Sequence, residues 1–148
     1  MVVLLATALT FVAAGCGGDE RLTQAEFQQE VVAARDRVDF ALARIPEAKS
    51  LDEYTNRMEE AAVVIDDAAS DLESVEPPEV FVPETNKLVK ALRQLSVDYS
   101  SSAEQIRLTP ELLTGTVGLS FDSWDQVNLA LAGLVGKGIQ VSVLQPHT

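Results

Sequence analysis

The chain has 148 residues, of which 47% are hydrophobic and 23% charged, a balance typical of one globular domain rather than of a disordered segment. Its formal net charge of −12 repels phosphate backbones, so we expect no nucleic-acid partner. Aromatic residues make up only 5% of the chain. A sequence rich in Ala, Val and Leu but poor in aromatics favours helices over a β-sandwich.

The first segment, residues 1–15, is uncharged and almost wholly apolar. It is too short for a transmembrane helix, which needs about 20 residues, and it has the length of a signal-peptide core. The segment ends at Cys16, the only cysteine of the chain, which has no partner for an internal disulfide. The sequence therefore predicts a cleaved signal peptide over residues 1–15. An ordinary secretory signal with an incidental cysteine is the alternative.

The residues before the cysteine, Ala13-Ala14-Gly15, resemble the lipobox of bacterial lipoproteins. In that family the cysteine thiol receives a diacylglycerol, and a peptidase cuts just before it. The resemblance implies lipidation at Cys16, a tether over residues 16–21, and a protein anchored in the membrane by its lipid on the extracytoplasmic face. No Lys or Arg precedes the apolar run, which suggests a basic segment upstream of the assigned start.

Four segments further along the chain carry apolar residues at alternating gaps of three and four, the spacing of one helix face. They cover residues 27–45, 51–75, 81–106 and, less regularly, 113–134. Thr23 with Glu26, and Ser50 with Glu53, form capping-box patterns before the first two segments. Prolines mark the other boundaries: Pro46 and Pro77-Pro78 end the first two helices, and Pro83 and Pro110 begin the next two.

Short connections between helices of this length favour antiparallel neighbours. The predicted fold is all-α, an antiparallel up-down-up-down four-helix bundle over residues 22–136. Gly115 and Gly118 weaken the fourth helix and could split it near residues 119–122. We expect residues 137–148 to leave the helix as a frayed tail.

The second segment and its exit, residues 51–79, hold ten acidic residues and one basic residue, a net −9 of the −12. On this segment a candidate stripe for a cation or a basic partner consists of Glu59, Asp66 and Glu73, seven apart, with Glu60 and Asp67 beside them. Carboxylates seven apart lie about 10 Å apart along a helix, too far to share one ion without further ligands. A solvated helix face is the plainer interpretation, and we predict no metal site.

Two smaller features are also candidates. The basic residues Lys87, Lys90 and Arg93 lie on the third segment, where pairing with acids of the second segment is the first interpretation and an anion site the second. Phe121 and Trp124 flank the predicted break in the fourth helix and could line a pocket there. Core packing is the alternative for both aromatics.

The sequence gives no support for catalysis. The only histidine, His147, falls in the predicted tail, so a Ser-His-Asp or metal-water mechanism has no base or ligand there. The sequence also has no Glu-x-x-His pair, no haem motif and no phosphate-binding glycine loop. We therefore expect no catalytic residues and no cofactor.

The start of the predicted mature chain, residues 22–27, and the Pro77-Pro78 turn are similar to those of small uncharacterised all-helical lipoproteins of high-GC bacteria. Many of those proteins carry a cysteine in the first helix, whereas Ala33-Ala34-Arg35 has none. The resemblance implies location and fold only. With the anchor and the periodic helices, it leads us to expect a non-catalytic interaction or assembly module with an envelope protein as partner. A small-ligand or cation-binding lipoprotein is the alternative.

Overall fold

The computed structural model describes residues 21–113 and 121–147. Four α-helices follow one another along this part of the chain: α1 (Gln24–Ala43), α2 (Leu51–Ser74), α3 (Val82–Leu108) and α4 (Asp122–Gly136). Three short 3-10 helices connect them: η1 (Ile45–Glu47), η2 (Glu79–Phe81) and η3 (Pro110–Leu113). No described residue lies in a β-strand, so the all-α prediction is confirmed.

Some of the predicted features lie outside the described residues. The predicted signal peptide, Cys16 and most of the tether fall in residues 1–20. Gly115 and Gly118, to which we attributed a break in the fourth helix, fall in residues 114–120.

The helix starts follow from the caps that the sequence predicts. At α1 the capping box is complete, because Thr23 accepts from the backbone of Glu26 while the Glu26 carboxylate accepts from the backbone N–H of Thr23. At α2 only half of the box forms. Ser50 accepts from the backbone of Glu53, but the Glu53 carboxylate accepts from the N–H of Lys49 instead of the cap residue.

The boundaries predicted at Pro46, Pro77-Pro78 and Pro83 are confirmed, whereas the helix start predicted at Pro110 is wrong. Pro46 lies in η1 just after α1 ends, and Pro83 lies in the first turn of α3. Pro110 begins only η3, whereas α4 begins at Asp122 after an extended residue, Phe121. A 3-10 turn satisfies few backbone groups and seldom extends far, so a Pro at its start does not by itself predict a long helix.

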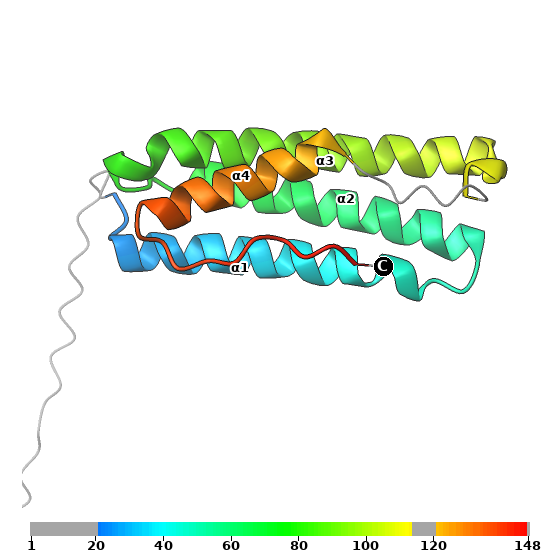
Figure 1. Cartoon of the computed structure of the whole chain (residues 1–148), viewed down its shortest axis with the longest axis horizontal. Coiled ribbons are helices and arrows are strands. Elements are labelled where there is room, and N and C mark those ends of the chain that lie inside the picture. Colours follow the sequence, from blue (N-terminus) through cyan, green and yellow to red (C-terminus); the bar gives the residue numbers. More distant parts are fainter. Residues whose placement is uncertain (1–20, 114–120, 148) are drawn as a thin grey trace, which may run out of the picture.

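The four helices pack side by side around one core (Figure 1). The most extensive contact is between α2 and α3, and α1 packs against α2 while α4 packs against α3. Each helix contributes side chains that are at most 2% exposed, such as Phe27, Ile65, Leu95 and Leu134. The predicted apolar faces of the first three segments therefore form the core.

The chain beyond α4 is not a frayed tail, contrary to our expectation. Residues 138–147, here called the C-terminal strap, run as an extended segment beside α1 (Figure 1). Ile139 and Leu144 are 1% and 2% exposed and belong to the core. The reason is that α1 and α4 make little direct contact with each other, so their seam is open to a segment carrying apolar side chains.

The turn into the strap is a Schellman motif at the end of α4. The N–H of Ile139 donates to the carbonyl of Leu134, and the N–H of Gly138 donates to that of Val135. Gly138 has φ +100°, a conformation that glycine adopts without a steric penalty. This reversal directs the strap back along the bundle.

Within residues 21–113 and 121–147, none of the helices is both long and apolar enough to cross a membrane.

Candidate functional site

The carboxylates of the acidic stripe on α2 pair partly with α3 and partly with the residue that follows α1. Three of its carboxylates pair with arginines of neighbouring helices: Glu59 with Arg107 and Glu73 with Arg93 on α3, and Glu60 with Arg44 next to α1. Asp66 and Asp67 are exposed and make no hydrogen bond or ion pair with another described residue. The stripe is therefore not one continuous free anionic surface.

The pair at Glu59 is part of a larger contact with the end of α3. Besides Glu59, the Arg107 guanidinium donates to Thr55 Oγ1 at 3.1 Å and to Asn56 Oδ1 at 2.8 Å. The hydrogen bond from Arg107 lowers the pKa of the Glu59 carboxyl and raises that of Arg107. A cation binding at Glu59 would have to displace this arginine.

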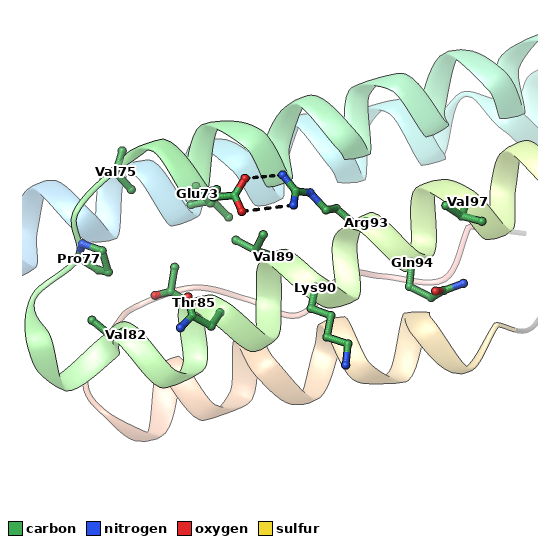
Figure 2. Close-up of a pocket in the computed structure, with 12 residues that line it drawn as sticks. Glu73, Val75, Pro77, Val82, Thr85, Val89, Lys90, Arg93, Gln94 and Val97 are labelled. Atoms are coloured by element: carbon green, nitrogen blue, oxygen red, sulfur yellow. Dashed lines mark hydrogen bonds and ion pairs between the residues drawn. The ribbon is translucent and has the colours of Figure 1, made fainter.

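A groove of about 450 Å³ lies between the end of α2 and the first half of α3 (Figure 2). The Glu73–Arg93 pair crosses one side of it, and Val75, Pro77 and Val82 lie toward its end. The groove thus combines an apolar end with a paired charged side.

The predicted pairing of the basic residues with α2 is confirmed for Arg93 alone. Lys87 lies 3.6 Å from Glu84 on its own helix. Lys90 lines the groove and makes no ion pair with a described residue. This lysine is the one cation of the three that a bound anion could use without breaking an existing pair.

A second groove, of about 530 Å³, lies between α1 and α2. It exposes large apolar side chains, with Phe40 69% and Val63 61% exposed. Its arginines are already paired: Arg37 with Asp71, Arg44 with Glu60, and Arg57 with Glu47 and Glu53. The groove is therefore apolar, with a rim whose charges are compensated.

Phe121 and Trp124 lie against the core and line neither groove. The ring of Phe121 meets that of Tyr99 edge-on, with centroids 5.1 Å apart. Burial raises the pKa of Tyr99 to about 12, and nearby Tyr54 adds to the effect. The geometry favours the core interpretation that we gave as the alternative for these aromatics.

The strap contacts a row of polar side chains that the sequence analysis did not identify. On α1 these are Gln24, Gln28, Arg35 and Asp39, spaced by four, seven and four residues and hence on one helix face. Each hydrogen-bonds to a backbone group of the strap: in the same order, to the carbonyl of Gly138, the N–H of Gln140, the carbonyl of Val143 and the N–H of Gln145. The distances range from 2.8 Å for the Gln28 contact to 3.3 Å for the Asp39 contact.

Asn128 of α4 contacts the strap from the other side. Its Oδ1 accepts from the N–H of Leu144 at 2.8 Å, and its Nδ2 lies 3.5 Å from the carbonyl of the same residue. The side-chain amide thus takes both backbone groups of one strap residue while the Leu144 side chain enters the core. We call these four α1 residues and Asn128, together with the core around Ile139 and Leu144, the strap site.

Charged groups cluster at the C-terminal end of the strap site. His147 Nε2 lies 3.2 Å from the Asp39 carboxylate. Arg35 lies 3.0 Å from Asp36 and 3.7 Å from Asp39, yet its Nε is buried without an acceptor. An unsatisfied buried donor is unfavourable, so the strap does not meet all the hydrogen-bonding capacity of its site.

The residues that the structure describes contain no group of three His, Asp or Glu side chains placed to hold a metal ion. Comparison of the chain with protein-family models, with curated proteins and with solved structures finds no match in any of the three.

Proposed function

We propose that this protein is a lipid-anchored interaction module of the cell envelope, without catalytic activity, held at the extracytoplasmic face by a lipid on Cys16. The observation that carries the proposal is the lipobox-like sequence before Cys16, followed closely by a folded helical domain. The membrane and an envelope protein are the proposed partners.

The start of the described chain supports this arrangement because it is fixed to one end of the bundle. The N–H of Leu22 donates to the carbonyl of Glu76 at 2.9 Å, and Arg21 donates to the carbonyl of Pro77 at 3.1 Å. An extended chain covers at most about 18 Å in five residues, the separation of Cys16 and Arg21. A lipid on Cys16 would therefore keep the turn between α2 and α3 near the bilayer.

For the helices themselves we propose the antiparallel up-down-up-down topology. The short connections, and the order of colours along neighbouring helices in Figure 1, support this assignment. In this topology the strap returns beside α1 because α4 ends near the start of that helix. The bundle would then present its surfaces along its length, away from the anchored end.

A role in interaction rather than catalysis is supported by how the charged side chains are used. Arg93 and Arg107 connect α3 to α2, and Arg37 connects α1 to α2. His147, the only histidine, lies beside the Asp39 carboxylate in the strap contact. These groups are engaged in holding elements together.

The alternative is a ligand-binding lipoprotein, and the groove in Figure 2 favours it over the acidic stripe. The groove offers about 450 Å³, the volume of a small-molecule site, and an unpaired Lys90. The stripe, in contrast, has Glu59 and Glu73 committed to arginines. An anionic small molecule is therefore the better candidate of the two.

The proposal is tested by crosslinking on intact cells, followed by affinity recovery of the protein and mass spectrometry. We expect a diacylglycerol thioether on Cys16 and one discrete envelope protein crosslinked to the anchored form. The control is Cys16→Ser, which cannot be lipidated and should lose the partner. An unmodified Cys16 in membrane fractions, or the same crosslinks in both forms, would contradict the proposal.

Thermal unfolding with a panel of small anions and calcium distinguishes the ligand-binding alternative from the proposed interaction module. A ligand present at 100 times its Kd adds about 2.7 kcal/mol to the stability of the folded state. Stabilisation by small anions, abolished by Lys90→Gln, would favour the ligand-binding function. Stabilisation by calcium would favour the acidic stripe instead.

A further inference from the structure

The strap site recognises its occupant mainly through the peptide backbone. Six hydrogen bonds join side chains of α1 and α4 to backbone N–H or carbonyl groups of the strap, and they come from the row of residues Gln24, Gln28, Arg35, Asp39 and Asn128. Backbone groups are the same in every peptide, so such bonds provide affinity with little dependence on sequence.

Sequence preference in this site comes from two buried side chains and one contact between an imidazole and a carboxylate. Ile139 and Leu144 are the fully buried strap side chains, five positions apart. Between them, Val141 is partly buried against the core and Val143 is 38% exposed. Three positions after Leu144, His147 lies beside the Asp39 carboxylate. The site therefore suits an extended segment with two aliphatic residues five apart and a basic residue three positions later.

We propose that the strap site binds such a segment of a partner protein in trans, and that the strap is its occupant in cis. This inference rests on the proposed function, of which it names the partner class: an extended aliphatic peptide with a basic residue near its C-terminal end. Backbone-directed bonds and alternate side-chain pockets are the features by which known peptide sites take extended ligands.

The strap can leave without separating the helices from one another. α1 packs on α2 and α4 packs on α3 through contacts that do not involve the strap. The strap connects to α4 through the turn at Gly138, and the buried Arg35 Nε has no acceptor while the strap is in place. A segment that offers an acceptor to this nitrogen would match the site better than the strap does.

Because the strap is tethered to the bundle, it competes strongly with an external peptide for the strap site. A short connection gives the strap an effective concentration in the millimolar range. The apparent Kd of a competitor equals its intrinsic Kd divided by the fraction of molecules whose site is open. Weakening the strap should therefore strengthen binding in trans. A purely structural tail would show the opposite, because weakening it would only destabilise the protein.

The experiment measures fluorescence polarisation of a labelled peptide of residues 138–147 with the full protein purified in mild detergent. We expect weak binding to the unmodified protein and binding at least tenfold tighter to Leu144→Ala, whose own strap is weakened. The matched control is Ser142→Ala, an exposed position on the same strap, which should bind as the unmodified protein does. Adding Asn128→Ala to Leu144→Ala should lower peptide affinity at least tenfold.

Two further peptides test the partner class. One keeps Ile, Leu and His at the positions of residues 139, 144 and 147, with Ala or Ser elsewhere, and should bind within about tenfold of the original because most contacts are to the backbone. The other carries Asp at the position of Leu144 and should not bind. If the Leu144→Ala protein loses its helical circular dichroism, Gln140→Pro replaces it, because it removes the N–H that donates to Gln28 Oε1 and leaves the buried Leu144 in place.

Absence of peptide binding by a folded strap-weakened variant would overturn the inference. So would binding of the original peptide but not of the one with Ala and Ser, since the site would then be specific for the strap. Concentration-dependent dimers that the peptide dissociates would assign the site to the strap of a second copy and overturn the partner class. Recovery of an envelope partner by crosslinking, with no peptide binding, would refute this inference while leaving the proposed function intact.

Discussion

The contact between α2 and α3 and the seam between α1 and α4 close the same core in different ways. Along α2 and α3, of 24 and 27 residues, helix meets helix, and Arg93 and Arg107 of α3 pair with α2. Between α1 and the shorter α4, of 15 residues, an extended strap fills the seam, and side chains of both helices hydrogen-bond to part of its backbone.

The difference shows two sources of stability. The helix pair satisfies its backbone internally, so its interface needs only complementary side chains. The strap has no hydrogen bonds between its own backbone groups, so its site must supply both apolar contacts and polar partners. We expect α2 and α3 to form the stable part of the fold and the strap the part that opens first.

The largest expected effect tests the helix pair. Ile65 is 0% exposed in α2, and Ile65→Asp places a charge there without a partner. We expect a loss of about 4 kcal/mol or more, seen as loss of helical circular dichroism at 25 °C. The matched control is Val63→Asp on the same helix, 61% exposed, which should change stability by less than about 0.5 kcal/mol. A folded Ile65→Asp protein would show that the core is elsewhere.

The next effect tests whether the strap belongs to the core. Leu144→Ala removes a side chain that is 2% exposed and should cost about 2 to 3 kcal/mol in denaturant unfolding. Val143→Ala, at the neighbouring and more exposed position, should cost less than about 1 kcal/mol. Equal, negligible effects would mean that residues 138–147 fray in solution and that the comparison between the two seams does not hold.

A smaller effect concerns the turn that leads into the strap. Gly138→Ala puts a side chain at φ +100° and 3.4 Å from Gln24, which should cost about 1 to 2 kcal/mol. Gly136→Ala has open space around it in the last turn of α4 and should instead stabilise the protein by about 0.5 kcal/mol. Thermal unfolding distinguishes the expected loss of stability in Gly138→Ala from the expected gain in Gly136→Ala. Destabilisation by both substitutions would show that the positive φ of Gly138 does not cause the loss.

The smallest effect concerns the ion pair at the far end of the helix pair. Because Arg107 lowers the folded-state pKa of Glu59, ionised Glu59 stabilises the protein above its unfolded pKa of about 4.5. This contribution is fully present at pH 7 and is lost as pH falls through the folded-state pKa. The pair is exposed to water, so Glu59→Gln should cost only about 0.5 kcal/mol at pH 7 and nothing near pH 2. Asp66→Asn, at an unpaired position on the same helix, should change stability at pH 7 less than Glu59→Gln does.

The helix pair was predictable from sequence because its signals are local. The apolar spacing of α2 places Met58, Ile65 and Leu72 in the core, and Ser50 caps its start as expected. The expected pairing of basic residues with α2 holds for Arg93, whereas Lys87 pairs within its own helix. A long side chain reaches several acids, so sequence spacing alone does not select its partner.

The strap was not predictable by the same reasoning, although its sequence carries a signal. Ile139, Val141 and Val143 alternate with polar residues, the pattern of an extended half-buried segment, but we expected a frayed tail because α4 ends just before. Four of its five polar partners lie more than 100 residues earlier on α1, and hydrogen bonds to backbone leave no pattern that pairs them with the strap. The sequence does not reveal the strap site because its hydrogen bonds go to backbone groups. The same feature makes the site tolerant of different strap sequences.

The strap hydrogen bonds give the protein its own reporters of local opening. The amides of Gln140, Leu144 and Gln145 donate to side chains of α1 and α4, so all three lose their acceptors when the strap departs. Helix amides keep theirs in the same event. Exchange of these three protons with deuterated water would thus follow one opening reaction, faster than exchange from the middle of α2. The free energy of that opening sets how often the strap site is vacant.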